Sequence, residues 1–296
     1  MIRFPKLAWL YLGYLIAVIL FGAWVRIAGA GAGCGNHWPL CNGEAIPPAP
    51  ETKTIIEYTH RITSALCGLF GIAMIWLAPV RRRRMAIAAF VFILIEGFVG
   101  AVLVKKELVV NDASLSRAIV IALHLTNTLL LTASAAAMTV EERRESKGRG
   151  VLLAALVVIV IVSATGAVTA LGDTIFPKQA ALDGSLWAQI RDDATSSQHF
   201  LIRLRAVHPV LAALGAAFLI GSLTSLRRRE PGFSHWPISL AGTQVLIGVA
   251  NIALAAPGWM QIVHLLVAQG LWVACVRAYV GAQRFRNSAL VTGPRR

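Results

Sequence analysis

The sequence is poor in charged residues, and acidic residues are the scarcest of them. Only 14% of the 296 residues are Asp, Glu, Lys or Arg, against 57% hydrophobic residues, and the mean hydropathy is +0.68. Soluble domains carry about a quarter charged residues, so this composition excludes that class and indicates a polytopic membrane protein. Basic residues outnumber acidic ones by 28 to 14. They cluster between apolar runs without interleaved polar and aromatic residues, which argues against nucleic acid as a partner.

Cysteine is also scarce, with four in the chain. Cys67 and Cys275 lie inside apolar runs, where a cysteine is most often a small core residue. Cys34 and Cys41 lie in a polar loop rich in Gly and Pro. In an oxidising compartment these two could form a disulfide. A structural link within the loop and a redox role are both open interpretations of this pair.

Long apolar runs dominate the rest of the chain. They predict an all-α polytopic membrane protein with eight transmembrane helices, at residues 7–27, 55–79, 85–104, 117–138, 151–171, 200–226, 236–255 and 259–283. Basic blocks at residues 81–84, 143–149 and 227–229 fall in alternate connections. Because cytoplasmic loops are enriched in Lys and Arg, we expect both termini in the cytoplasm and a location in the cell (plasma) membrane, in contact with its lipid bilayer.

The chain repeats a pattern of four spans. His60 in the second span corresponds to His208 in the sixth, and His124 in the fourth corresponds to His264 in the eighth. The repeat predicts two four-helix bundles related by a pseudo-twofold axis along the membrane normal, residues 1–145 and residues 146–296. Further matched positions are Gly22 with Gly166, Glu96 with Gln244, and Gly100 with Gly248. For Glu96 we expect a polar partner on a neighbouring helix.

The four repeated histidines all lie a few residues inside the outer end of a span. A rise of about 1.5 Å per residue places them at a similar shallow depth, as one pair per bundle. Two imidazoles facing each other suit the axial ligation of an iron porphyrin, whereas zinc more often has four protein ligands. Small residues beneath His60 and His208 predict room for a planar macrocycle; they are Ser64, Cys67, Gly68 and Gly71 in one span and Ala212, Gly215 and Ala216 in the other.

The two halves differ three residues before the first histidine of each pair. The first half has Glu57 there and the second has Arg205. A guanidinium suits pairing with a haem propionate, whereas a carboxylate would repel one and is better suited to accepting protons. This difference predicts a permanent haem in the second half and a porphyrin that is changed in the first. An ion pair between Glu57 and Arg61, four residues apart, is the alternative explanation for the acid.

The motif Glu57-Tyr58-Thr59-His60-Arg61, the loop Cys34-Gly35-Asn36-His37-Trp38-Pro39-Leu40-Cys41 and the placement of His124, His208 and His264 together resemble the haem A synthase family. The resemblance covers nearly the whole chain. It implies an oxidoreductase that converts the C8 methyl group of haem O to a formyl group, giving haem A for terminal oxidases, with haem b as cofactor.

The resemblance also implies roles for single residues. His60, His124 and Arg61 would bind the substrate haem, His208 and His264 would ligate haem b, and Glu57 would be catalytic. Cys34 and Cys41 would be joined by a disulfide, and a haem O synthase or an electron-transfer protein would be a partner. Some relatives carry a second cysteine pair in the second long outer loop. Residues 176–199 contain no cysteine here, which leaves the haem assignment unaffected.

Two other functions fit part of the pattern. A dihaem b-type cytochrome for electron transfer would use all four histidines but would give Glu57 no task. A transporter for a porphyrin or a cation would suit the duplicated bundles, although the spans lack the broken helices that usually mark transport sites.

Overall fold

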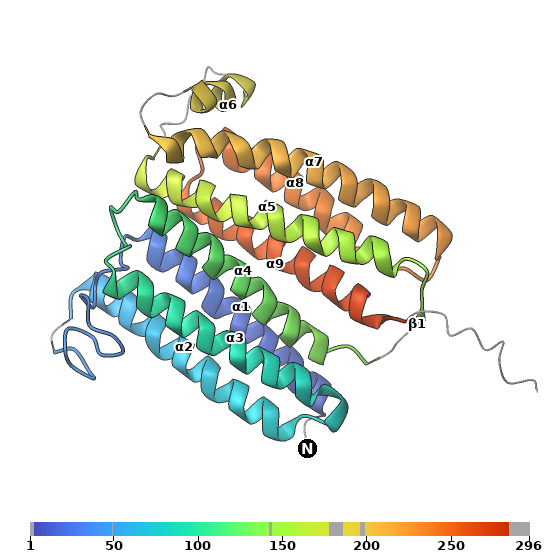
Figure 1. Cartoon of the computed structure of the whole chain (residues 1–296), viewed down its shortest axis with the longest axis horizontal. Coiled ribbons are helices and arrows are strands. Elements are labelled where there is room, and N and C mark those ends of the chain that lie inside the picture. Colours follow the sequence, from blue (N-terminus) through green and yellow to red (C-terminus); the bar gives the residue numbers. More distant parts are fainter. Residues whose placement is uncertain (1–2, 49, 142–143, 178–185, 196–198, 284–296) are drawn as a thin grey trace, which may run out of the picture.

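The protein crosses the membrane several times as an all-α bundle. The computed structural model (Figure 1) describes the chain apart from residues 1–2, 49, 142–143, 178–185, 196–198 and 284–296. Eight of the described helices are long and apolar enough to cross a membrane, as predicted. They are α1 (Phe4–Ile27), α2 (Thr52–Leu77), α3 (Val80–Lys105), α4 (Leu115–Met138), α5 (Arg149–Ile175), α7 (Phe200–Arg229), α8 (Trp236–Ala253) and α9 (Gly258–Gly281). Helices suit a bilayer because all their backbone hydrogen bonds lie within one segment.

Three features differ from the sequence-based expectation. A further short helix, α6 (Leu186–Thr195), lies in the connection between α5 and α7, where only a loop was expected. Two-residue strands, β1 (Arg144–Glu145) and β2 (Ala282–Gln283), pair in parallel. The basic blocks at residues 81–84 and 227–229 belong to the end turns of α3 and α7 and not to connecting loops. Arginine is a good helix former, and its long side chain can reach water from a helix end.

The transmembrane helices pack as two groups of four. Helices α1, α2, α3 and α4 contact one another in a ring, and α5, α7, α8 and α9 form a second ring. The groups meet where α4 packs against α5 and α9, and where α1 packs against α9. In Figure 1 the first group fills the lower part of the view and the second the upper part. A pseudo-twofold relation between the groups stays a prediction, as does a division into domains at residue 145.

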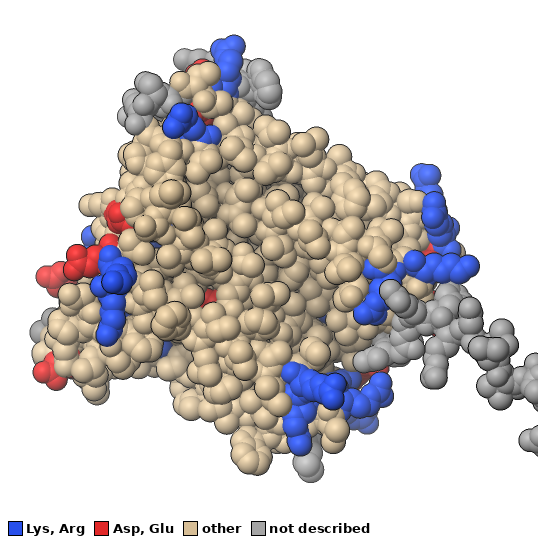
Figure 2. All heavy atoms as spheres, in the orientation of Figure 1, with Lys and Arg blue, Asp and Glu red and all other residues tan. Residues whose placement is uncertain are grey.

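The two ends of the molecule differ in charge. At one end of the molecule α3 begins with residues 81–84 and α7 ends with residues 227–229; we call this the basic end. The opposite end contains residues 28–51 and α6, and we call it the loop end. Figure 2 shows Lys and Arg crowded at the basic end, whereas most of the acidic side chains visible in this view lie at the loop end.

The close-packed core lies toward the basic end and runs through both helix groups. Its buried members include Tyr11 of α1, Met74 of α2, Leu152 of α5, Leu223 of α7 and Trp272 of α9. The second cluster of buried side chains is small and lies near the loop end; it contains Ala118, Leu171 and Leu201. The four repeated histidines lie in the loop-end half, and each retains some accessible surface. The histidines therefore lie apart from the close-packed core.

Candidate functional site

His60, on α2, packs against the backbone of α1 at Gly22. A Cβ on Gly22 would lie 2.9 Å from Cε1 and 3.2 Å from Nε2 of the imidazole, so a side chain there would displace the ring. Phe21 approaches the ring edge-on, with 5.8 Å between ring centres. Nδ1 of His60 is buried with no hydrogen-bond partner among the described residues. Buried polar atoms are normally bonded, so this imidazole is suited to a ligand that the protein itself does not supply.

His124, on α4, is paired with an acid from α3. Glu96 Oε2 lies 2.5 Å from Nδ1 of His124. The other carboxylate oxygen accepts hydrogen bonds from the Asn127 amide at 2.9 Å and the Thr128 hydroxyl at 2.8 Å. The prediction of a polar partner for Glu96 on a neighbouring helix is confirmed. Nδ1 of His124 has no hydrogen-bond partner of regular geometry in the described part of the chain, so its contact with Glu96 is an ion-pair contact. Nε2 is the ring nitrogen that does not contact Glu96.

His208, on α7, contacts α5 in the same way as His60 contacts α1. A Cβ on Gly166 would lie 3.0 Å from Cε1 of His208. Thr165 Oγ1 lies 3.2 Å from His208 Nδ1 and donates its own hydrogen to the Val162 carbonyl at 2.8 Å. Because the hydroxyl hydrogen is used, Oγ1 accepts from an Nδ1–H group. This tautomer leaves the Nε2 lone pair free to bind a metal.

His264, on α9, faces His208 across the second helix group. The two ring centres are 6.4 Å apart and the ring planes lie at 85°. Metal–imidazole bonds of about 2 Å, extended by the radius of each ring, separate the centres of two axial imidazoles by about 6 Å. Gln244 Nε2 lies 3.1 Å from His264 Nε2, and His264 Nδ1 is buried without a hydrogen-bond partner in the described part of the chain. The pair fits the axial ligation of one iron porphyrin.

Two of the small residues beneath the histidines, Gly71 and Gly215, do not leave the predicted room. A Cβ on Gly71 would lie 3.2 Å from the Tyr11 hydroxyl and 3.5 Å from Phe90. In the second group a Cβ on Gly215 would lie 3.0 Å from Val162 and 3.1 Å from Val158. That prediction is wrong at these two positions, because side chains of neighbouring helices fill the space. Small residues here allow close helix packing, as they often do in membranes.

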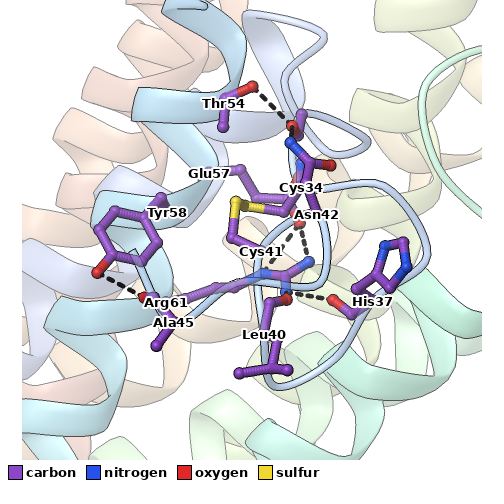
Figure 3. The surroundings of a disulfide bond; sticks show 11 residues. Cys34, His37, Leu40, Cys41, Asn42, Ala45, Thr54, Glu57, Tyr58 and Arg61 are labelled. Carbon is purple, nitrogen blue, oxygen red and sulfur yellow. Dashed lines mark hydrogen bonds and ion pairs between the residues drawn. A yellow bond between two sulfur atoms is a disulfide. The ribbon is translucent and has the colours of Figure 1, made fainter. Parts of the chain in front are cut away.

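The loop between α1 and α2 is closed by a disulfide and attached to α2 (Figure 3). Cys34 and Cys41 are bonded, as predicted, and both are buried. The backbone N–H of Cys34 donates to Oε2 of Glu57 at 2.8 Å, and the Thr54 hydroxyl donates to the Gly33 carbonyl at 2.7 Å. One oxygen of Glu57 is therefore used to hold the disulfide loop.

Arg61 binds both Glu57 and the loop. Its Nε and Nη2 donate to Oε1 of Glu57 at 3.1 and 2.5 Å. Its Nη1 donates to the backbone carbonyls of His37 and Leu40, each at 2.6 Å (Figure 3). The alternative explanation for Glu57, an ion pair with Arg61, is therefore present. Glu57 is 4% exposed, and each of its oxygens has a protein donor.

Arg205 occupies the matched position in the second group and is also buried. Its Nη1 lies 3.3 Å from Asp173 Oδ1 and donates to the Phe176 carbonyl at 2.9 Å. Its Nε lies 4.0 Å from Asp193 Oδ2 on α6. The guanidinium predicted to meet a haem propionate thus has two acidic neighbours of its own. Each half neutralises the charged residue that precedes its histidine.

Arg26 of α1 forms polar contacts with the second helix group, which the sequence patterns did not indicate. Its Nη1 donates to the Ala170 carbonyl on α5 at 2.6 Å and contacts the Thr174 hydroxyl, and its Nη2 donates to Gln261 Oε1 on α9 at 3.0 Å. The only available signal was an arginine at the end of an apolar run. Its partners are more than a hundred positions away in the sequence.

No group of three or more His, Cys, Asp and Glu side chains that could hold a metal ion lies within the described residues. His199 and His235, to which the sequence assigned no function, occupy the N-cap positions of α7 and α8.

Comparison with known proteins gives the family of the chain. Over residues 5–276 the chain matches the family described as COX15-CtaA, cytochrome oxidase assembly protein. A Thermus thermophilus protein named protoheme IX farnesyltransferase is 38% identical over 293 residues, which cover 93% of this chain and 47% of that protein.

Proteins named heme A synthase are similar over shorter stretches. The protein from Symbiobacterium thermophilum is 38% identical over 98 residues, 31% of this chain and 32% of its own. The protein from Halalkalibacterium halodurans is 45% identical over 93 residues, 29% and 31% of the two chains. The chain thus spans about half the length of the Thermus relative and matches about a third of the other two. Because the family match extends over nearly all of the sequence, the chain belongs to the COX15-CtaA family of cytochrome oxidase assembly proteins.

Proposed function

We propose that this protein is a haem A synthase, an oxidoreductase that converts the C8 methyl group of haem O into the formyl group of haem A. The observation that carries the proposal is the pair of imidazoles His208 and His264, whose 6.4 Å separation suits one iron porphyrin, in a chain of the COX15-CtaA family. The name heme A synthase on several partial relatives supports it.

In this proposal the second helix group holds haem b. His208 and His264 would hold its iron, and Thr165 would fix the tautomer of His208. Arg205 would donate to a haem propionate. A guanidinium carries five N–H groups, so donors remain beyond those that bind Asp173 and Phe176. Bound haem b supplies one-electron chemistry at iron.

The first helix group receives haem O as substrate, through His60 and His124. The wide accessible surface of His124, whose side chain is 36% exposed, suits a ligand that must arrive and leave. Glu57 acts as the catalytic carboxylate. It keeps lone pairs beyond those used by Cys34 and Arg61. Oxidation of the methyl group, whose electrons would pass to the electron-transfer partner proposed below, releases protons that need an acceptor. Arg61 contributes mainly by fixing Glu57, because most of its donors are used there and on the loop.

The proposed setting is the cell membrane, with the basic end in the cytoplasm and the disulfide loop outside. The crowding of Lys and Arg at one end supports this orientation. A haem O synthase is the proposed partner. The Thermus relative is named protoheme IX farnesyltransferase, and this chain covers under half of it, which supports a partner of that kind. A separate electron-transfer protein is the second proposed partner.

One observation favours a second candidate, a dihaem b-type cytochrome. The contacts of Glu57 with Cys34 and Arg61 give this acid a structural task without any reaction. Extraction of haem from the purified full-length protein, with identification by chromatography and mass, separates the candidates. Haem b with haem O or haem A supports the synthase. Haem b alone, at two per chain, supports the cytochrome.

Glu57→Gln tests the role of the acid itself. Gln has nearly the same shape and keeps an oxygen that can accept from the Cys34 N–H group, so the loop stays attached. We expect haem content to be unchanged and the conversion of haem O to haem A to fall by about 100-fold or more, as for loss of a general base. Arg61→Met is the matched variant, because it removes the ion pair and leaves the carboxylate. Conversion at an ordinary rate by Glu57→Gln, with intact haem binding, would show that Glu57 is only structural.

A further inference from the structure

Glu96 is a charged residue that the proposed reaction does not use. Its carboxylate is 15% exposed and lies between α3 and α4 in the loop-end half of the first helix group. One oxygen is 2.5 Å from His124 Nδ1, an ion-pair distance, although Nδ1 has no hydrogen-bond partner of regular geometry among the described residues. The other accepts from Asn127 Nδ2 and Thr128 Oγ1, and Asn127 also donates to the Phe92 carbonyl at 2.9 Å. The acid is therefore held in one position by both helices.

We infer that Glu96 is a positioning residue for His124, which it holds in a ligating orientation and makes a stronger electron donor to iron. The inference rests on the proposed function, in which His124 binds the haem in the first helix group. A carboxylate next to the N–H of a metal-bound imidazole fixes the ring and raises the basicity of the ligating nitrogen. With Nδ1 turned to Glu96, the ligating nitrogen is Nε2.

The second helix group has no acid at the equivalent place. Gln244 stands at the position that matches Glu96 and contacts Nε2 of His264, not Nδ1, through a neutral amide at 3.1 Å. The other ring nitrogen of His264 has no hydrogen-bond partner among the described residues. His208 contacts the neutral hydroxyl of Thr165. Among the described contacts of the four histidines, a carboxylate is found at His124 only. The two haems would therefore differ in the charge that is applied to their axial ligands.

This difference has an electrochemical consequence. A more basic ligand stabilises ferric iron relative to ferrous iron, so the haem bound by His124 has the lower midpoint potential of the two. Replacing the acid by an amide would give His124 and His264 the same type of neutral partner. We expect Glu96→Gln to raise that potential and to leave the haem on His208 and His264 unchanged. Loss of an outer partner of a metal ligand costs about 10- to 100-fold in metal affinity. A tenfold change between the two iron oxidation states corresponds to 59 mV for one electron.

The test is a redox titration of the full-length protein in detergent, purified with its haem and saturated with haem O, followed by visible absorption. The expected wild-type curve has two components. In Glu96→Gln we expect the midpoint potential of the lower component to rise by at least about 59 mV, which corresponds to a tenfold change, or this component to be lost. The midpoint potential of the upper component should stay unchanged, which shows that the protein is folded. Glu96→Asp keeps the charge and should lie closer to wild type than Glu96→Gln does.

The outcomes separate this inference from the function on which it rests. Two wild-type components with neither moved nor lost in Glu96→Gln would overturn the role of Glu96 and leave the synthase proposal intact. A single wild-type component, absent in His208→Ala, would mean that the first helix group binds no haem. The proposed function would then fail before any Glu96 variant is considered. A shift of both components together would also overturn the inference, because it would mean a general loss of structure.

Discussion

The two helix groups solve the same electrostatic problem with opposite charges. Three residues before its first histidine, one has Glu57 and the other has Arg205, and both side chains are almost completely buried. Glu57 is neutralised by Arg61 and a backbone N–H group, whereas Arg205 is neutralised by Asp173, Asp193 and a backbone carbonyl. A buried charge needs such compensation. The opposite charges of Glu57 and Arg205 are therefore explained by their protein partners before any ligand is considered.

The contacts at the second histidine of each group carry more information about function. Glu96 and Gln244 occupy matched positions and both contact the matched histidine, but only one of them is charged. Here the partner of the charged residue is the proposed iron ligand itself. The two groups therefore differ in the charge next to a proposed iron ligand. The following variants test how far the comparison between the groups holds.

The largest effect is expected from Arg205→Met in the second group. Asp173 and Asp193, whose side chains are 14% and 12% exposed, would each lose one cationic neighbour. Breaking a buried pair on one side costs about 3–5 kcal/mol, so we expect a loss of this size in the free energy of unfolding, measured by denaturation in mixed detergent micelles. In the first group Arg61→Met should cost less, about 1–3 kcal/mol, because Glu57 keeps the Cys34 N–H group.

Arg203→Met is the control for this experiment. Arg203 lies two residues away on α7 and is exposed, so its replacement should change the unfolding free energy by less than about 0.5 kcal/mol. Equal losses in Arg203→Met and Arg205→Met would mean that the contacts of Arg205 contribute nothing specific.

The sequence predicted the eight spans and the histidine positions because both depend on local patterns. A run of apolar residues is sufficient to predict a membrane helix. The filling of the space near Gly71 by Tyr11 and Phe90 was missed because periodicity identifies a small face but not the side chain that packs on it. The contacts of Arg26 were missed for the same reason. Helix α6 was missed because it is short and follows a polar segment.

A medium effect is expected from reduction of the disulfide, a feature of the first group that has no cysteine counterpart in residues 176–199. The bond joins residues seven positions apart, and closing so short a loop stabilises the folded state by about 2 kcal/mol. Reduction of the wild-type protein with dithiothreitol should lower the unfolding free energy by this amount. The double variant Cys34→Ser with Cys41→Ser should already be lower and should not respond to the reductant. If dithiothreitol also lowered the unfolding free energy of the double variant, the loss of stability would not come from this disulfide.

The smallest effect concerns the glycines against which the first histidine of each group packs. A methyl group at Gly22 or Gly166 would lie about as close as 2.9 or 3.0 Å to the ring of His60 or His208. Displacing a side chain by about 30° from its rotamer costs about 0.5–1.5 kcal/mol.

We therefore expect Gly22→Ala to weaken haem binding in the first group, and Gly166→Ala in the second, by a few-fold to about tenfold. Titration of each variant with haem, followed by absorption, would measure this. Gly13→Ala in α1 and Gly150→Ala in α5 are matched controls, because a Cβ at either position meets nothing within 4 Å. If each alanine weakens only the haem of its own group, the two groups use the same helix contact to orient their ligands. If Gly22→Ala has no effect while Gly166→Ala does, the repeat is preserved in sequence but not in how His60 is held.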